Sequence, residues 1–217
     1  MPNTLSDSLS RIAGTDYQNR LVKAHQRLVE LIAERLYEDM EQDDKVLSDS
    51  IWSGDTPGRW LASMSKYRRL GFSCQRLAEV ADRCISYQKP TGTYGYCPSP
   101  PPGGQIFGDG RLIRALASVY QVEGWDRCLE SAQKSARYLE SLLPFGNNES
   151  DKAWFAAFPE VASAAGLPFV DLFETDGDRR WLDAAGEIGF GGHHTQFPIG
   201  AASDQLNSPV LVGEPGR

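Results

Sequence analysis

The sequence is poor in the residues that bind metals or form disulfides. Its 217 residues include four cysteines and three histidines, and no two cysteines form a C-x-x-C pair. Cysteines spaced in this way predict no zinc site and suit a reducing compartment. His193 and His194 are adjacent but stand in a stretch without periodicity, and two imidazoles without further ligands do not make a metal site. We therefore expect no metal, no cofactor and a cytoplasmic location.

Positive charge and long apolar runs are also scarce. There are 22 Lys and Arg residues against 29 Asp and Glu, a formal net charge of −7. Because binding to nucleic acid needs clustered cations, this balance argues against such a partner. No apolar run is long enough to span a membrane, and the first residues lack the basic start and apolar stretch of a secretory signal. Gly103-Gly104 lacks the lysine that would follow in a phosphate-binding loop.

The sequence does contain a repeated helix-pair pattern. Gly71, Gly124 and Gly177 lie 53 residues apart, and each follows an aromatic residue by four positions. Apolar residues recur at intervals of three and four on both sides of each glycine, which predicts amphipathic helices joined at a turn. Glycine suits the left-handed conformation that ends a helix. We therefore expect three stacked αα-hairpins, because one hairpin cannot bury its own apolar face.

The same periodicity places the expected elements along the chain. It predicts a leading helix and three hairpins, over residues 16–40, 57–88, 108–143 and 159–185. Residues 89–107 are rich in Gly and Pro and are expected to form a loop. Pro168 is expected to kink the helix that contains it. The last helix is expected to fail at Gly186, so that residues 1–185 form the helical domain and residues 186–217 an irregular tail.

Helix pairs of about 50 residues predict an all-α fold that is part of an (α/α) toroid. In such a ring, inner helices surround a cavity and outer helices cover them. A closed ring needs about six pairs, so three pairs predict an arc. TPR and HEAT-like solenoids are the alternative, but their repeats are about 34 and 40–47 residues long. Because the last outer helix is expected to be short, Phe169, Leu172 or Phe173 should form an exposed apolar edge that favours self-association.

Several short motifs resemble those of a known family. They are Gly58-Arg59-Trp60, Tyr87-Gln88, Gly92-Thr93-Tyr94-Gly95, Gly110-Arg111-Leu112 and Phe158-Pro159-Glu160. Over residues 52–185 the chain resembles the N-terminal part of the β-L-arabinofuranosidase-type glycoside hydrolases. The resemblance implies a six-hairpin glycosidase fold, an (α/α) barrel, and carbohydrate metabolism that degrades arabinofuranosides or related plant glycans.

The chain also departs from the pattern of that family. Arg111 and the stretch Ala162-Ser163-Ala164 stand where the family has histidines. The zinc-bound cysteines and the acidic residues of the family lie further along than this chain extends. We therefore expect an incomplete N-terminal portion, a fragment without hydrolytic activity. A helical-repeat module that binds carbohydrate or protein without catalysis is the alternative.

Three acidic residues are the candidates for catalysis. Asp55, Asp109 and Glu160 stand near the beginnings of the first helices of the hairpins, which converge on one mouth of the cavity in a toroid. Glycoside hydrolysis normally uses two carboxyl groups on either side of the bond. Acidic residues at these positions also cap helices and offset the helix dipole, so a structural role is the alternative.

Six residues are the candidates for carbohydrate binding. They are Trp52, Arg59, Trp60, Tyr94, Tyr96 and Arg111. Aromatic rings offer apolar faces to the C–H groups of sugars, and arginine offers a fixed fork of donors for hydroxyl or carboxylate oxygens. The structural alternatives are that Trp60 packs in the core and that the arginines pair with Asp55 or Asp109. The expected ligand is an arabinose-containing or related glycan.

Overall fold

The computed structural model describes residues 14–30, 36, 54–95, 103–143 and 159–191, and these are helical with no strand. Their seven helices are α2 (Asp16–Glu30), α4 (Asp55–Arg69), α5 (Leu77–Ser86), α6 (Gly103–Glu123), α7 (Asp126–Ser141), α9 (Pro159–Asp176) and α10 (Arg180–Gly191). An isolated bridge joins Gln88 and Tyr94. None of the described helices is long and apolar enough to cross a membrane. The prediction of an all-α fold is therefore confirmed.

The three predicted hairpin turns are confirmed. Gly71, Gly124 and Gly177 have φ angles of 84°, 70° and 76°, in the left-handed region. The N–H of Gly124 donates to the carbonyl of Tyr120 at 2.7 Å, and that of Gly177 to the carbonyl of Phe173 at 2.8 Å. A Cβ added at any of the three glycines would meet no atom within 4 Å. The backbone conformation, and not crowding, therefore requires glycine at these turns.

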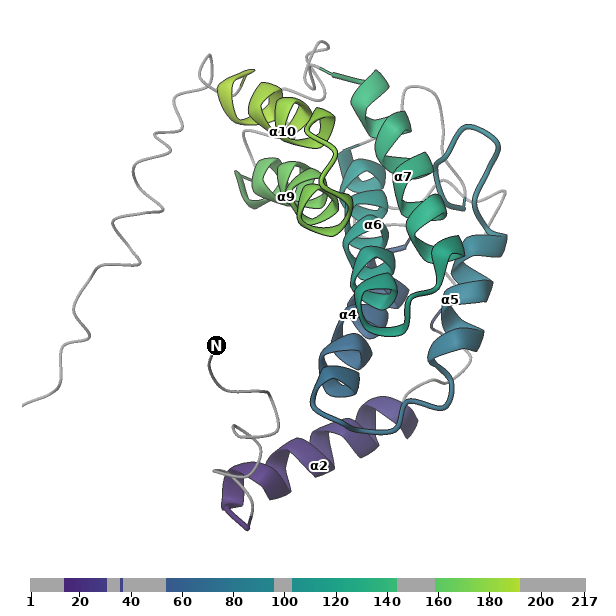
Figure 1. Cartoon of the computed structure of the whole chain (residues 1–217), viewed down its shortest axis with the longest axis vertical. Helices are drawn as coiled ribbons and strands as arrows, with labels where there is room; N and C mark the ends of the chain where they lie inside the picture. The colour runs from purple at the N-terminus through teal and green to yellow at the C-terminus, as the bar shows by residue number, and fades with distance from the viewer. Residues whose placement is uncertain (1–13, 31–35, 37–53, 96–102, 144–158, 192–217) are drawn as a thin grey trace, which may run out of the picture.

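The first helices of the hairpins form one layer (Figure 1). α6 packs against α4 on one side and against α9 on the other, and α5, α7 and α10 each pack on the first helix of their own hairpin. α4, α6 and α9 therefore form one layer and α5, α7 and α10 lie on it. We call α4, α6 and α9 the inner helices and α5, α7 and α10 the outer helices. The core lies where the layers meet, and α6 lies at its centre.

α6 leaves only a narrow face uncovered because three helices contact it. Between Gln105 and Val119, the positions that are not buried are Arg111, Arg114 and Ser118. They are three and four residues apart, so they lie on one face of the helix. The remaining positions in this span are buried and mostly apolar. The solvent-facing stripe of the central helix therefore carries two arginines.

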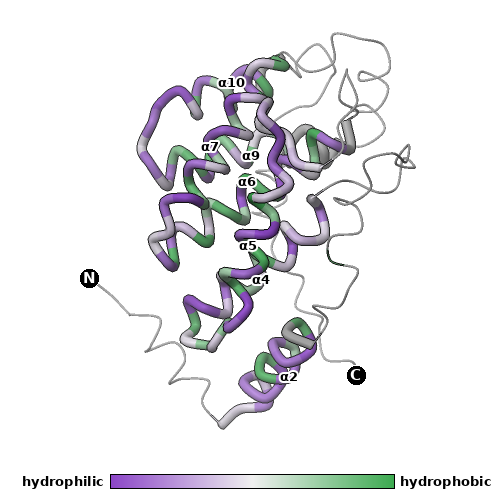
Figure 2. The backbone as a smooth tube through the Cα atoms, turned by 90° about the vertical axis from the view of Figure 1, so that its right-hand side faces the viewer, coloured by the Kyte–Doolittle hydropathy of each residue, from purple (hydrophilic) through white to green (hydrophobic). Residues whose placement is uncertain are grey.

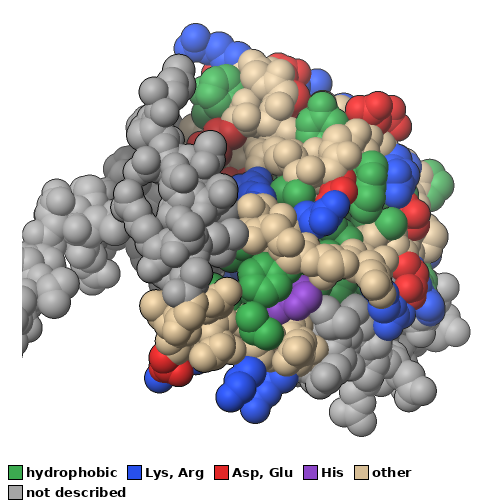
Figure 3. Space-filling view, turned by 60° about the horizontal axis from the view of Figure 1, so that its bottom comes forward, with side chains coloured by type: hydrophobic (Ala, Val, Ile, Leu, Met, Phe, Trp, Pro, Cys, Tyr) green, Lys and Arg blue, Asp and Glu red, His purple; other side chains and the backbone are tan. Residues whose placement is uncertain are grey.

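α2 contacts α4 and the turn that follows it. The ring N–H of Trp60 donates to the carbonyl of Leu28 at 3.0 Å. The ring of His25 lies 5.0 Å from the rings of Tyr67 and Phe72. In the space-filling view the histidine lies beside hydrophobic side chains (Figure 3). Hydrophilic and hydrophobic positions alternate along α2 (Figure 2), as expected of a helix with one packed face.

Two of the expected helix boundaries are wrong. α6 begins at Gly103 instead of Gly108, so its first turns occupy part of the predicted loop. α10 continues past Gly186 to Gly191. Packing explains the second difference. A glycine destabilises a helix by about 1 kcal/mol relative to alanine, and the packing of Ile188 against the core offsets this cost. The predicted leading helix is described only as far as Glu30. The predicted irregular tail begins at residue 186, but its first residues, up to Gly191, belong to α10.

The predicted exposed apolar edge is also wrong. Phe169 and Leu172 are fully buried, and Phe173 is half-buried. The ring of Phe169 stacks on that of Trp181 from α10, with the ring centroids 6.1 Å apart. α10 therefore covers α9, which runs as one helix through Pro168. Self-association stays a prediction, without this edge to support it.

Candidate functional site

Three of the predicted site residues meet where the first two turns of α4 lie against the middle of α6. Arg59 Nε donates to both carboxylate oxygens of Asp55, at 3.0 and 2.9 Å. These two residues lie one turn apart on α4. Arg111 approaches the same carboxylate from α6, with Nε 3.5 Å from Asp55 Oδ1. One aspartate is thus shared by two guanidinium groups from neighbouring inner helices, which is the ion-pair alternative foreseen for these arginines.

Two glycines make this approach of the helices possible. A Cβ at Gly58 would lie 3.1 Å from the carbonyl carbon and the Cβ of Arg111. A Cβ at Gly54 would lie 2.5 Å from Leu112 Cδ1, and Gly54 also has a φ of 88°. The backbone of α4 can lie directly against α6 only because both positions lack a side chain. The close packing places Asp55 beside Arg111.

A second ion pair adjoins the first and was not foreseen from the sequence. Arg114 Nε donates to Asp171 Oδ2 at 2.5 Å, which links α6 to α9. Arg114 follows Arg111 by three residues and lies on the same exposed stripe of α6. That spacing is the signal that could have identified it. We call Arg59, Arg111 and Arg114 the arginine cluster.

The arginine cluster has unused hydrogen-bonding capacity. Each guanidinium turns only its Nε toward an acid, and no other described residue accepts a hydrogen bond from the terminal nitrogens. Arg111 Nε is itself buried without a well-aligned acceptor among the described residues. Its guanidinium carbon lies 4.8 Å from the centre of the Phe107 ring, a distance at which a cation and an aromatic face attract.

Electrostatics distinguishes Arg111 from the other two arginines. Burial lowers its pKa below the usual range of arginine, the carboxylate of Asp55 opposes this shift, and the positive charges of Arg59 and Arg114 add to it. An arginine remains charged nonetheless. The pKa of Arg111 is lowered chiefly because its side chain is partly buried, and the carboxylate of Asp55 offsets this shift only in part.

Two other predicted site residues, Tyr94 and Asp109, are fully buried. Asp109 Oδ2 accepts from the Thr93 hydroxyl at 2.8 Å, and its Oδ1 accepts from the Tyr94 N–H at 3.1 Å and from Gln105 Nε2 at 2.9 Å. The Tyr94 hydroxyl lies 2.8 Å from Ser131 Oγ on α7. Both side chains therefore fasten the segment before α6 to α6 and α7. Neither side chain is accessible to a ligand in this structure.

Burial changes the acidity of Asp109. It raises the pKa of this carboxyl group to about 7, although the hydrogen bonds from Thr93, Tyr94 and Gln105 lower it. A carboxyl group with a pKa near neutrality is typical of a general acid. However, a general acid must also reach the reacting bond, and Asp109 has no exposed surface. The hydrogen bonds that Asp109 accepts from Thr93, Tyr94 and Gln105 therefore indicate a structural role for this residue.

The motif of the family resemblance in this segment also has a structural role. Gln88 Nε2 donates to the carbonyl of Gly92 at 3.0 Å and to that of Ser131 at 2.8 Å. Gly92 has a φ of 115°, and a Cβ there would lie 2.6 Å from the carbonyl oxygen of Lys134. The glutamine and the glycine thus hold the segment 88–95 tightly against α7. The motif is a marker of local packing.

The remaining predicted site residues do not join the arginine cluster. Trp60 is 5% exposed and packs in the core, which is the alternative foreseen for it. Glu160 lies in the first turn of α9, but its side chain is not described. Trp52 and Tyr96 lie outside the described residues, as do His193 and His194. Among the residues that are described, no group of three or more His, Cys, Asp or Glu could hold a metal ion.

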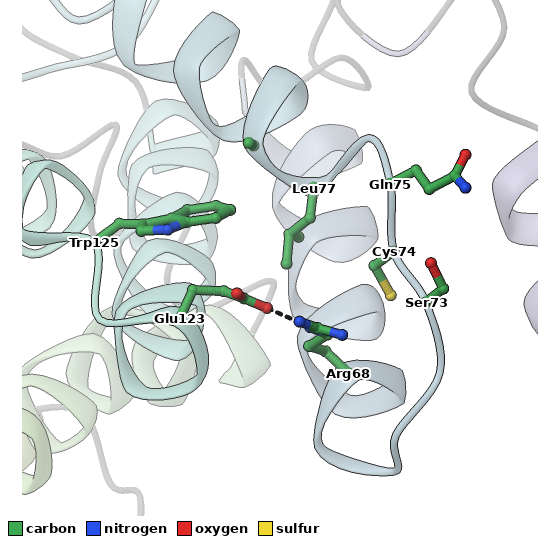
Figure 4. A pocket seen from close by; sticks show the side chains of 8 residues that line it. Arg68, Ser73, Cys74, Gln75, Leu77, Glu123 and Trp125 are labelled. Atoms are coloured by element: carbon green, nitrogen blue, oxygen red, sulfur yellow. Dashed lines mark hydrogen bonds and ion pairs between the residues drawn. The ribbon is translucent and has the colours of Figure 1, made fainter.

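A separate cavity lies at the other ends of α4 and α6 (Figure 4). Its volume is about 250 Å³, and the ion pair between Arg68 Nε and Glu123 Oε1, 2.6 Å long, spans it. Leu77 and Trp125 form apolar walls, and Cys74 borders it. Burial raises the pKa of the Cys74 thiol, which makes it a poor nucleophile at neutral pH. No predicted site residue borders this cavity.

The chain matches no protein-family model, no curated protein and no solved structure. Its class is therefore defined by its own architecture, which in the described residues is a leading helix and three αα-hairpins whose first helices pack side by side. The likeness to arabinofuranosidase-type glycoside hydrolases stays a prediction, since no comparison supports it.

Proposed function

We propose that the chain is an arc of an (α/α) toroid related to glycoside hydrolases, and that it binds carbohydrate where the first two turns of α4 lie against the middle of α6. The arrangement of the hairpins supports the arc. First helices lie next to first helices, second helices cover them, and each turn is made by a glycine of the same conformation. A toroid of the arabinofuranosidase type uses its helix pairs in this way.

The observation that carries the binding proposal is the arginine cluster with Asp55. Sugars present several hydroxyl groups, each of which both donates and accepts hydrogen bonds. The terminal guanidinium nitrogens of Arg59 and Arg111 supply donors that no other described residue uses, and Asp55 supplies acceptors beside them. Such convergent polar groups fix the orientation of a ligand.

Binding without hydrolysis is the activity that these residues support. Asp55 forms ion pairs with Arg59 and Arg111, so its carboxylate oxygens are occupied by two guanidinium groups. Asp109 has a raised pKa but is sealed inside the fold. Hydrolysis requires two carboxyl groups that both contact the glycosidic linkage. We therefore assign to the arginine cluster the recognition of the sugar and no step of bond cleavage.

Isothermal titration of the 217-residue chain with arabino-oligosaccharides tests this proposal. We expect saturable binding that is weakened at least tenfold by Arg111→Gln. The matched control is Arg127→Gln, which removes another arginine that pairs with an aspartate, Asp82, on the outer helices. Absence of binding by the unaltered chain, or equal binding by both variants, would contradict the proposal.

A further inference from the structure

The solvent-facing side of α4 and α6 carries an excess of positive charge. The arginine cluster contributes three positive charges, and its arginines form ion pairs with two acids, Asp55 and Asp171. Lys66 lies two turns after Arg59 on the same face of α4, is exposed, and pairs with no acid among the described residues. This local excess stands out in a chain whose formal net charge is −7. A neutral sugar alone would give no reason for it.

The geometry of the cluster suits a carboxylate in particular. Guanidinium groups bind carboxylates through two parallel hydrogen bonds, and charge-assisted bonds of this kind are stronger than bonds to neutral hydroxyls. Asp55 and Asp171 use the Nε side of the cluster, so the terminal nitrogens remain available for a second carboxylate. The Phe107 ring supports the guanidinium of Arg111 at 4.8 Å and limits its movement.

The same side of α6 continues as a polar track. Ser118 and Gln121 follow Arg111 and Arg114 at helical spacing, over a length of about 15 Å at 1.5 Å per residue. Gln121 Nε2 donates to Thr175 Oγ1 of α9 at 2.7 Å, which extends the track to the third inner helix. Hydroxyl and amide groups arranged in a line suit an extended, hydroxyl-rich ligand better than a single small anion.

We propose that the arginine cluster recognises the carboxylate of an acidic sugar, so that the ligand is an oligosaccharide containing uronic acid. This inference rests on the proposed carbohydrate-binding function and narrows it. The carboxylate pairs with terminal nitrogens of Arg111 and Arg114, and neighbouring sugar rings lie along the track toward Gln121. Asp171 competes with the ligand for Arg114, so it limits the affinity.

A titration with three probes tests this inference on the whole chain. The probes are tri-galacturonic acid, the neutral galactotriose of similar size, and inorganic phosphate. We expect the acidic trisaccharide to bind at least tenfold more tightly than galactotriose at low ionic strength. The difference should shrink at high salt, because screening weakens interactions between charges that are exposed to solvent. Phosphate should bind much more weakly than the acidic trisaccharide.

Variants separate recognition from folding. Arg114→Gln should weaken binding of the acidic trisaccharide at least fivefold and leave galactotriose nearly unaffected. Asp171→Asn should instead strengthen acid binding several-fold, because it removes a competing carboxylate, an effect that a merely structural ion pair would not produce. Arg127→Gln is again the control. Each variant is used only after its thermal midpoint is shown to be close to that of the unaltered chain.

The outcomes distinguish this inference from the function on which it rests. If galactotriose and the acidic trisaccharide bind equally through Arg111, the preference for uronic acid is wrong and carbohydrate binding stands. If phosphate binds as tightly as the acidic trisaccharide, the cluster recognises any small anion and the inference is overturned. If neither these probes nor arabino-oligosaccharides bind, both proposals fail.

Discussion

At the residue scale, the buried carboxyl group of Asp109 shows how one side chain can suggest catalysis and yet serve the fold. Its position near the beginning of an inner helix made it a catalytic candidate. The structure surrounds it with donors from Thr93, Tyr94 and Gln105, and no part of it is exposed. Gln105 lies one turn before Asp109 on α6, but Thr93 and Tyr94 come from a segment before α6 whose path depends on tertiary packing, and the sequence contains no signal for them.

The pH dependence of unfolding tests the assignment of Asp109. Its folded-state pKa of about 7 lies above the value of about 3.9 for an unfolded chain. The folded protein therefore retains a proton between these values, so the contribution to stability is complete below pH 4 and is lost as the pH rises through 7. Relative to Asp109→Asn, which does not titrate, the unaltered chain should lose about 4 kcal/mol between pH 4 and pH 8, since each unit of pKa difference corresponds to about 1.4 kcal/mol. Parallel urea-unfolding curves for the two proteins would contradict this.

A second variant of Asp109 tests its hydrogen bonds. Asp109→Ala leaves the Thr93 hydroxyl and the Tyr94 N–H without their acceptor inside the fold, while Gln105 Nε2 keeps the carbonyl of Tyr94 at 3.1 Å. We expect a loss of about 3 kcal/mol in the free energy of unfolding, since buried unsatisfied groups cost about 1–3 kcal/mol each and some relax. Asp109→Asn, with a similar shape, should lose much less at pH 5. Equal losses for the two variants in urea titrations would argue against the network.

At the element scale, periodicity predicted the hairpins correctly but not all of their ends. The turns at Gly71, Gly124 and Gly177 follow from backbone conformation, which is a local property that a sequence records. The beginning of α6 at Gly103 and the extension of α10 to Gly191 depend on partners elsewhere in the chain. For this reason the expected edge at Phe169, which is covered by Trp181, was wrong.

The close contact of α4 and α6 can be tested with two glycines that both lie within helices. Gly58→Ala places a methyl group 3.1 Å from backbone atoms of Arg111, and should destabilise the chain by about 1–3 kcal/mol. Gly166→Ala is the matched control, because its nearest neighbour is Ile188 Cγ2 at 3.8 Å. There alanine should stabilise by about 0.5–1 kcal/mol through helix propensity. Thermal unfolding that ranks the two variants in the opposite order would refute this packing.

At the scale of the whole molecule, average properties conceal the candidate site. The net charge of −7 gives no sign of a local cluster of cations, yet Arg59, Lys66, Arg111 and Arg114 share one side of two inner helices. The pairing of Arg59 and Arg111 with Asp55 could be expected from the sequence, because each arginine follows a glycine at a similar place in its hairpin. The pair of Arg114 with Asp171 could not, because it depends on how α9 packs on α6.

The absence of hydrolysis is the expectation for the whole chain. With Asp55 paired to arginines and Asp109 buried, we expect no turnover of p-nitrophenyl α- or β-L-arabinofuranoside above a heat-killed control. The measurement is release of p-nitrophenol by the purified 217-residue protein. Turnover that disappears on mutation of Glu160 or Asp109 would show that the chain carries the chemistry.

NMR of the arginine side chains tests the central claim most directly, because it locates a bound sugar. In a spectrum of the Nε–H groups, we expect oligosaccharide to shift the signals of Arg59, Arg111 and Arg114 in a saturable manner. Arg127, which stacks on Trp125 in the outer layer, should not move. Shifts confined to arginines outside the cluster, or no saturable shift of any arginine, would contradict the account.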